Sequence, residues 1–168
     1  KSYSEKHDVM ILTGDQDILQ LVDDGIQVAI MRKGIGNYEV FSKDNFYEKK
    51  GIHPYQVVDV KGLMGDTSDN YPGVKGIGEK TAVKLIKEHE SIDQLLENLN
   101  ELPKGVQTKI RNNMDMLLLS RKLAEIKCDV PVSCSLEDAE WYLHEDKILK
   151  KFDELEFNHL AKLIKTTV

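Results

Sequence analysis

The sequence predicts an α/β fold in which a partial sheet of about three strands precedes a mostly helical subdomain. Two observations support this. Short apolar runs separated by turn residues fill residues 9–41, and beyond them the apolar spacing becomes that of amphipathic helices. The composition is that of a globular domain, since 40% of the residues are hydrophobic and 31% are charged. No apolar run reaches the roughly 18 residues of a membrane span, so no membrane partner is expected.

Three segments are expected to be strands. Residues 9–12 form a continuous apolar run, which is typical of a strand buried on both faces. A Thr-Gly-Asp turn and a short helical stretch at 18–22 follow. The second strand is expected at 26–31, and the alternating pattern at 38–41 predicts the third. Polar residues after such strands are the usual position of a binding site in α/β folds.

The later residues are expected to form helices. Ser42 can cap a helix that stops at Gly51, and Pro54 can open the next one. Ser91 begins a capping-box signature. The expected helices cover residues 42–50, 54–64, 79–89, 91–99, 103–126 (as two helices) and 147–165.

Charge is distributed unevenly along the chain. The net charge of −6 does not indicate a general nucleic-acid binder. Residues 74–87 nevertheless hold four lysines and one glutamate, and residues 104–122 hold five basic residues and one acidic residue. Residues 137–156 hold eight acidic and three basic residues. A nucleic-acid-binding face can therefore lie in the middle of an acidic protein. The cysteines, Cys128 and Cys134, are too few for a disulfide framework and lack zinc-ligand spacing.

Two pairs of carboxylates are candidate metal ligands. Asp15 and Asp17 follow the first expected strand, and Asp66 and Asp69 follow the apolar end of an expected helix. Closely spaced carboxylates in a turn can converge on a hard cation such as Mg²⁺. Each pair also has a simpler explanation, a helix cap for the first and a polar turn for the second. The second pair does not fit an EF-hand loop, because other residues stand where that loop needs Gly and Glu.

A glycine-rich segment at residues 72–81 opens the helix expected at 79–89. It is not a P-loop, because Glu79 separates the last glycine from the lysine. Backbone N–H groups at such a helix N-terminus form an anion site that can hold DNA by its phosphates, although a plain helix cap is the alternative. A side chain at Gly76 or Gly78 would block the phosphate or strain a backbone with positive φ. The residues expected to contact DNA are Gly73, Val74, Lys75, Gly76, Ile77, Gly78, Lys80, Thr81 and Lys84.

The order of these motifs resembles the 5′-nuclease family. A strand is followed by Thr-Gly-Asp-x-Asp, about fifty residues later by Gly-Asp-x-Ser-Asp-Asn, and at once by Pro-Gly-Val-x-Gly-Ile-Gly-Glu-Lys-Thr-Ala. Within the family, the resemblance is closest to the 5′→3′ exonuclease domain of bacterial DNA polymerase I. Further stretches that look like this family lie at residues 21–24, 32–34, 61–64, 118–120 and 155–157.

The resemblance implies a metal-dependent 5′→3′ exonuclease or 5′-flap endonuclease that acts in DNA replication and repair. The four aspartates named above correspond to carboxylates of a two-metal site for Mg²⁺ or Mn²⁺, and no catalytic group beyond these metal ligands is implied. A helix–three-turn–helix element at about 62–90 would hold double-stranded DNA with a 5′ flap or a nick. In some members this loop binds K⁺ through backbone carbonyls, and Val74 and Ile77 are the matching positions.

The resemblance also implies how the chain is organised. Residues 1–52 correspond to the C-terminal part of the α/β nuclease core, and residues 53–168 correspond to the helical DNA-binding subdomain. The N-terminal half of the family's domain, with further metal-ligand carboxylates, is absent from this sequence, so the isolated fragment is expected to be inactive. A cytoplasmic, nucleoid-associated bacterial protein with a C-terminal polymerase domain in its parent chain is implied.

Two other functions compete with the nuclease. The first is a non-catalytic fragment that binds duplex DNA without sequence preference, and it agrees with the nuclease on DNA contact but not on hydrolysis. The second is a helical interaction module that uses the acidic tail at 137–156. An interaction module is disfavoured, because it would leave the glycines and lysines at 73–84 without a function.

Overall fold

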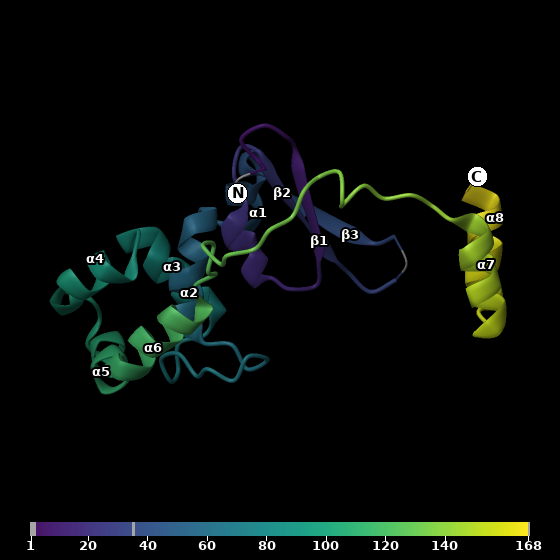
Figure 1. The fold of residues 1–168 in the computed structure, drawn as a ribbon. Coiled ribbons are helices and arrows are strands. Elements are labelled where there is room, and N and C mark those ends of the chain that lie inside the picture. Colours follow the sequence, from purple (N-terminus) through teal and green to yellow (C-terminus); the bar gives the residue numbers. More distant parts are fainter. Residues whose placement is uncertain (1–2, 35, 168) are drawn as a thin grey trace. The chain divides into compact units, whose positions relative to one another are not determined.

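The structure is a computed structural model that describes residues 3–34 and 36–167. It contains a three-stranded sheet followed by helices, which confirms the predicted fold class (Figure 1). The chain divides into two compact units, Lys1–Cys128 and Asp129–Val168. The first unit holds the sheet and every candidate site residue. The division that the resemblance implies between residues 52 and 53 falls inside this unit and stays a prediction.

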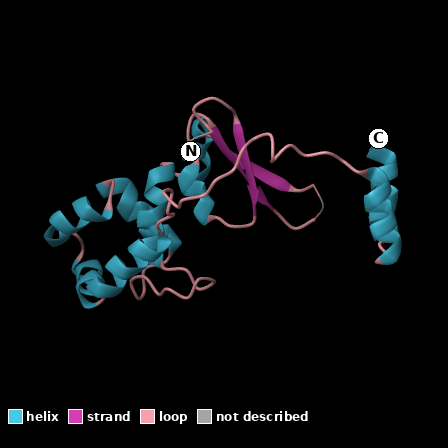
Figure 2. Cartoon of the chain, in the orientation of Figure 1, coloured by secondary structure: helices cyan, strands magenta, loops and turns pink. Residues whose placement is uncertain are grey.

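The sheet consists of three strands in the order β1 (Val9–Thr13), β2 (Ile26–Met31) and β3 (Tyr38–Phe41). β1 and β2 are parallel and are joined through a short 3₁₀ helix, η1 (Asp17–Leu21). β2 and β3 are antiparallel. η1, which follows β1, packs against α2 (Val57–Met64) and η2 (Pro54–Gln56), so the turn after β1 lies beside the helical part of this unit (Figure 2).

The two faces of this sheet differ in burial. Val28, Ile30 and Phe41 point into the core and are almost fully buried. On the other face, Met10 and Leu12 of β1 are 58% and 62% exposed. The prediction that β1 is buried on both faces is therefore wrong. A continuous apolar run shows that both sides of a strand can be buried, but it does not show what covers them.

The helices of the first unit begin and end close to the predicted residues. α1 (Lys43–Lys50) starts after Ser42, whose N–H donates to Asn45 Oδ1 at 3.1 Å, and it ends at Gly51 with φ +72°. This αL residue is the usual C-terminal stop of a helix. The remaining elements of the unit are η2 (Pro54–Gln56), α2 (Val57–Met64), α3 (Glu79–His89), α4 (Ile92–Glu97), η3 (Leu99–Glu101), α5 (Lys104–Asn112) and α6 (Met114–Ala124).

α2 is the central helix of the first unit. It packs against α3, α6 and η1, and Leu63 on its inner face is fully buried. Its Asp59 is 4% exposed, accepts the Ile92 N–H at 3.1 Å and forms an ion pair with Arg121 of α6 at 2.7 Å. A buried charge is tolerated when it is paired and hydrogen-bonded in this way. α2 is therefore held by its neighbours on three sides. It also carries Lys61, which lines the candidate site described below.

The second unit contains α7 (Glu145–Glu154) and α8 (Asn158–Thr167). The sequence predicted one helix at 147–165, and this prediction is wrong, because the chain reverses between the two helices. Glu156 adopts φ +57°, the Phe157 N–H donates to the Phe152 carbonyl at 2.8 Å, and the two phenylalanine rings lie 6.0 Å apart. Apolar spacing continues on both sides of this turn, so periodicity alone does not reveal it.

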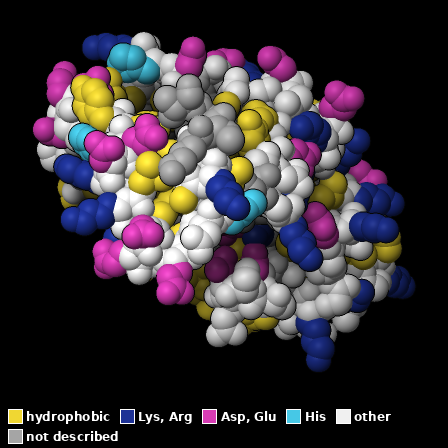
Figure 3. Space-filling model, turned by 90° about the vertical axis from the view of Figure 1, so that its right-hand side faces the viewer, with side chains coloured by type: hydrophobic (Ala, Val, Ile, Leu, Met, Phe, Trp, Pro, Cys, Tyr) yellow, Lys and Arg dark blue, Asp and Glu magenta, His cyan; other side chains and the backbone are white. Residues whose placement is uncertain are grey.

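Charged side chains of both signs are interspersed on the face drawn in Figure 3. The net charge of the full sequence is −6. Within the described residues, no helix is both long enough and apolar enough to cross a membrane.

Candidate functional site

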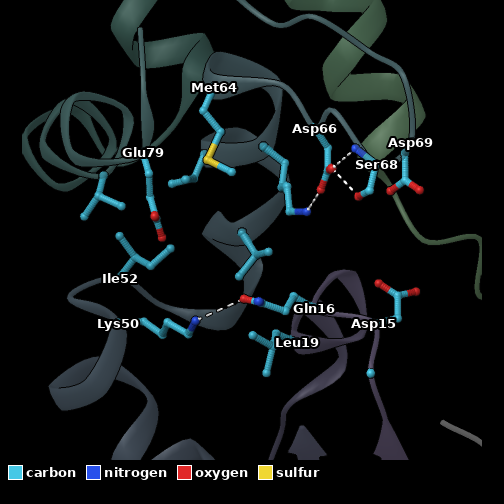
Figure 4. A pocket seen from close by; sticks show the side chains of 15 residues that line it. Asp15, Gln16, Leu19, Lys50, Ile52, Met64, Asp66, Ser68, Asp69 and Glu79 are labelled. Carbon is cyan, nitrogen blue, oxygen red and sulfur yellow. Dashed lines mark hydrogen bonds and ion pairs between the residues drawn. The ribbon is translucent and has the colours of Figure 1, made fainter. Parts of the chain in front are cut away.

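A cavity of about 500 Å³ in the first unit brings three of the four candidate aspartates together. Asp15, Asp66 and Asp69 lie along one side of it, and Lys50 and Glu79 lie along the other (Figure 4). Its walls come from the turn after β1 and η1, from the end of α1, from α2 and the turn after it, and from α3. We call this cavity, with the residues that line it and with Asp17, which pairs with the lining residue Lys61, the acid pocket.

The turn after β1 is built by its own polar side chains. The Asp15 N–H donates to Thr13 Oγ1 at 3.0 Å, and the Asp17 N–H donates to Asp15 Oδ1 at 2.8 Å. Asp15 therefore stabilises the first turn of η1, as the simpler explanation of this pair predicted, and it lines the acid pocket at the same time. A helix cap and a ligand position do not exclude each other here, because a carboxylate has two oxygens.

The turn after α2 is closed more tightly. Asp66 and Tyr71 exchange backbone hydrogen bonds of 2.8 and 3.1 Å, and the Ser68 N–H donates to Asp66 Oδ1 at 2.8 Å. Gly65 has φ +73°, and a Cβ added there would lie 2.5 Å from the carbonyl carbon of Pro72. Asp66 is thus held by the backbone on one side, and its carboxylate projects into the acid pocket (Figure 4).

Lys61 of α2 joins the two turns. Its ammonium lies 2.6 Å from Asp17 Oδ1 and also contacts Asp66 Oδ2 closely. The side chains of these three residues are only 12%, 13% and 15% exposed. The two carboxylates accordingly lie less than about 5 Å apart, with a positive charge between them. Sequence reasoning missed Lys61 as a site residue, although a lysine inside the apolar helix segment 57–64 was a detectable anomaly.

The pKa values of this trio follow from burial and pairing. Burial acts to lower the pKa of Lys61, but hydrogen bonds to Asp17 and Asp66 outweigh it and hold that pKa well above the usual range. The contact with Lys61, followed by that with Ser68, holds the pKa of Asp66 well below its usual range. Burial raises the pKa of Asp17 despite the opposing effect of Lys61. Asp66 is therefore the more firmly ionised of the two carboxylates.

Tyr71 lies among the same charges. Its side chain is 4% exposed, and its buried hydroxyl has no hydrogen-bond partner among the described residues. Burial raises the pKa of this hydroxyl to about 12, and the negative charge of Asp17 adds to the effect. Because buried hydroxyl groups are normally hydrogen-bonded, an unpaired hydroxyl among these charged side chains fits a site that binds a hydrated ion.

The donor chemistry fits a hard divalent cation, which prefers carboxylate oxygens. The geometry is less complete. Within residues 3–34 and 36–167, no three His, Cys, Asp or Glu side chains are close enough to hold one metal ion. The structure brings Asp17 and Asp66 together through Lys61, and it brings Asp15 and Asp69 to the same pocket. The assignment of all four as ligands of two metals stays a prediction.

The segment that we call the glycine loop, residues 73–78, connects the Asp66 turn to α3. Val74 and Ile77 are 1% and 4% exposed, so their side chains anchor the loop and only their backbone can face a ligand. The Gly73 N–H donates to Ser120 Oγ of α6 at 3.0 Å. The loop is thus fixed to the core by two buried side chains and by a hydrogen bond to α6. Of the residues expected to contact DNA, the structure leaves exposed Lys75, Gly76, Gly78, Lys80, Thr81 and Lys84.

The glycines of this loop have different roles. Gly73 and Gly76 have φ of +60° and +84°, which favours glycine. A Cβ on Gly73 would also lie 2.3 Å from the Gly65 nitrogen. Gly78 caps α3 with φ −98°, and a Cβ there would meet nothing within 4 Å. Of the two reasons considered for glycine at these positions, a positive φ applies at Gly76, and at Gly78 only the approach of a ligand could require glycine.

A lysine from another helix reaches the glycine loop. Lys109 of α5 donates to the Gly76 carbonyl at 2.9 Å and stays exposed. The Val74 carbonyl already accepts the Ile77 N–H at 3.0 Å. Nothing in these contacts tests the K⁺ site that the resemblance implies at Val74 and Ile77. They show that a cationic group can bind a carbonyl oxygen of this loop.

Comparison with known proteins gives a family and a fold. Residues 52–147 match the family described as "5′-3′ exonuclease, C-terminal SAM fold". A 5′-3′ exonuclease of Bacillus subtilis is 58% identical over 137 residues, which are 82% of this chain and 46% of that protein. A DNA polymerase I of the same organism is 41% identical over 157 residues, which are 92% of this chain and 18% of that protein. The chain thus spans less than half the length of these curated relatives.

Among solved structures, a complex of the flap endonuclease of bacteriophage T5 with DNA and metal ions has the same fold. Its TM-score is 0.61 and its identity is 21%, over 73% of this chain and 44% of that chain. At this identity the likeness establishes the fold alone. The correspondence covers the larger part of this chain.

Proposed function

Because the chain belongs to the 5′-3′ exonuclease family, we propose that it is part of a metal-dependent nuclease that hydrolyses DNA at a 5′ end, flap or nick. The observation that carries this proposal is the acid pocket, in which Lys61 holds Asp17 and Asp66 together beside two further aspartates. The glycine loop follows this pocket directly along the chain and leads into α3. Acidic and anion-binding groups are therefore adjacent, as phosphodiester hydrolysis requires.

The proposed ligands for Mg²⁺ or Mn²⁺ are Asp15, Asp17, Asp66 and Asp69. Two such ions, when bound, would generate a hydroxide from water and neutralise the charge on the attacking and leaving oxygens. The chain contributes oxygen donors that stay ionised, above all Asp66, whose pKa is held low. The buried Tyr71 hydroxyl has no partner among the described residues and interacts electrostatically with Asp17, Lys61 and Asp66, so it would be a hydrogen-bonding group for a ligand near these residues.

The glycine loop and α3 would hold double-stranded DNA by its phosphates. Backbone N–H groups in the first turn of a helix have no partner within that helix and attract anions. Lys75 and Lys80 are exposed beside them, and Lys84 follows one turn later. Such contacts read no bases, so binding would be independent of sequence and would weaken with salt. The K⁺ site implied for this loop would use the carbonyls of Val74 and Ile77.

A non-catalytic binder of duplex DNA is the second candidate function. It is favoured by the finding that no three metal-binding side chains come together in the described part of the chain. The two candidates share the glycine loop and differ only in whether hydrolysis occurs.

We place the activity in DNA replication and repair in the bacterial cytoplasm, near the nucleoid. The support is that curated relatives over most of this chain are a 5′-3′ exonuclease and DNA polymerases I of bacteria. Similarity to the DNA polymerases I would imply a polymerase domain in the parent chain, whereas similarity to the 5′-3′ exonuclease would not.

A cleavage assay tests the proposal. The 168-residue chain is incubated with a labelled 5′-flap duplex in Mg²⁺ or in EDTA, and binding of the same duplex is followed by fluorescence anisotropy. Asp66→Asn serves as the inactive variant, and Asp146→Asn in the second unit serves as a control for the loss of one carboxylate. Cleavage that needs Mg²⁺ and disappears in Asp66→Asn supports the nuclease. Binding without cleavage supports the second candidate, and the lack of both contradicts both candidates.

A further inference from the structure

The Lys61 ammonium occupies the space between the two carboxylates that come closest together in the acid pocket. It is 2.6 Å from Asp17 Oδ1 and in close contact with Asp66 Oδ2. Asp17 Oδ1 is buried, and the ammonium is its ionic partner. A divalent cation that bound both carboxylates would need the same space, since ligand oxygens lie only about 2.0 to 2.6 Å from such an ion.

The surroundings make this contact stronger than an ordinary surface ion pair. All three side chains are at most 15% exposed, so water screens their charges weakly. Asp15 and Asp69 add further negative potential at the same place. The lysine also lies on α2, which is packed on three sides, so its stem cannot move away with its helix. Release of the ammonium therefore requires a change of its side-chain rotamer.

We propose that Lys61 is a tethered counter-ion that competes with divalent metal for the pair Asp17 and Asp66. It holds the turn after β1 and the turn after α2 together in the metal-free protein, and it is displaced when a metal binds between them. Metal affinity at this pair is thus set below what two carboxylates alone would give. The inference rests on the proposed metal site and adds a positioning residue that neither the family match nor the sequence motifs assign.

The wild-type chain gives the first test, and it needs no variant. In ¹⁵N-lysine NMR spectra, the Lys61 NH₃⁺ group should give a slowly exchanging signal in the metal-free protein, because it is buried and doubly paired. Addition of Mg²⁺ should shift or remove this signal, whereas the signal of the exposed Lys109 should not change. A Lys61 signal that stays unchanged at a Mg²⁺ concentration that saturates the protein would overturn the inference.

Variants give the second test, with Mn²⁺ binding followed by electron paramagnetic resonance of the free ion. Lys61→Met should bind Mn²⁺ at least about tenfold more tightly than wild type, because a competing charge within contact distance is removed. Lys61→Arg keeps the charge and should stay near wild type. Lys50→Met is the matched control: Lys50 lines the same pocket but contacts Gln16 Oε1, at 3.5 Å, and its loss should change the affinity far less.

The outcomes separate this inference from the proposed function. Equal or weaker Mn²⁺ binding by folded Lys61→Met would mean that Lys61 only supports the structure. The same gain in Lys50→Met would mean that general charge, and not the tethered contact, sets the affinity. If wild type and every variant bind no Mn²⁺, the proposed metal site itself fails. If Lys61→Met does not fold, the wild-type NMR result alone decides.

Discussion

The acid pocket and the glycine loop are adjacent along the chain. In each region a lysine side chain from a helix contacts polar groups, but the two contacts differ in kind. Lys61 is 12% exposed and pairs with two carboxylates. Lys109 is exposed and donates to one neutral carbonyl, that of Gly76. The first contact neutralises buried charge, and the second leaves the loop and its cation open to solvent. One region is therefore organised by electrostatics and the other by backbone geometry.

This difference predicts which substitutions matter in each region. In the acid pocket, removal of either sign leaves the other sign buried without compensation, which is among the costly changes in proteins. At the glycine loop and the start of α3, substitution of the exposed lysines should change stability little. Loss of the buried hydrogen bond from the Gly73 N–H to Ser120 should lower stability clearly. The predictions below test this division, beginning with the largest expected effect.

The sharpest test compares the two lysines. Lys61→Met should lower the free energy of unfolding by about 3 kcal/mol or more, because Asp17 and Asp66 are left close together without a counter-charge. Lys109→Met should lower it by less than about 0.5 kcal/mol, because an exposed hydrogen bond is replaced by water. Urea denaturation followed by circular dichroism measures both. Similar losses in the two variants would abolish the distinction between the regions.

Within the glycine loop, Gly73 and Gly78 should respond differently. Gly73→Ala should cost about 2 to 4 kcal/mol, because its Cβ would overlap the Gly65 nitrogen at 2.3 Å and its φ is +60°. Gly78→Ala should change stability by less than about 1 kcal/mol, since its φ is −98° and its Cβ meets nothing within 4 Å. Thermal melts of the two variants provide the measurement. A large loss at Gly78 would show that its backbone differs from the one described.

The anchor beneath this loop is a third target. Ser120 is fully buried, and its hydroxyl accepts the Gly73 N–H at 3.0 Å. Ser120→Ala should cost about 1 to 3 kcal/mol, because a buried N–H loses its partner. Thr108→Ala on α5 is the control, since its hydroxyl donates to the Lys104 carbonyl on an exposed surface. Equal effects of the two substitutions, measured by urea denaturation, would mean that Ser120 does not hold the loop.

Several elements could be predicted from the sequence because their signals are local. The three strands, the stop of α1 at Gly51 and the start of α3 depend on turn residues and apolar spacing within a few residues. Two features could not be predicted, for different reasons. The exposure of Met10 and Leu12 depends on which distant segments cover β1, whereas the turn at Glu156 is local but is hidden by apolar spacing that continues on both sides of it.

The candidate site divides in the same way. Motif spacing identified Asp15, Asp66 and Asp69, and the structure brings these three to one pocket. Lys61 was not predicted as a site residue because its partner Asp17 lies 44 positions earlier, and no local pattern links the two. The lysine was visible only as a charged residue in an apolar helix segment, which indicates that a buried partner exists but not which residue it is.

Acid should affect the acid pocket through Asp66. Its folded-state pKa is lowered, so its ionised form stabilises the protein above the usual value of 3.8, and this contribution is lost as the pH falls below that value. Asp17 has a raised pKa and acts in the opposite direction. Melting temperatures between pH 5 and pH 2.5 should therefore fall less steeply in Asp66→Asn than in wild type. Identical pH profiles would show that the pair with Lys61 contributes little.

The smallest effect on stability is expected at the exposed lysines of the glycine loop and α3, where the effect on DNA binding should be clear. Lys75 and Lys80 are exposed, and neither helps to anchor the loop. If each contacts a phosphate, its change to Ala should reduce the slope of log affinity against log salt by about one unit, and this change should not depend on the DNA sequence. Lys150→Ala on α7 removes the same charge from the second unit and should leave the slope unchanged.

Gly78→Val should instead weaken binding at every salt concentration, since a side chain at the start of α3 blocks close approach of a phosphate without strain in the backbone. Filter binding of short duplexes from low to moderate salt separates these effects. Equal affinity of Gly78→Val and wild type at low salt would reduce the glycine loop to a helix cap, and the acid pocket would then be the one region of the two with a ligand to bind.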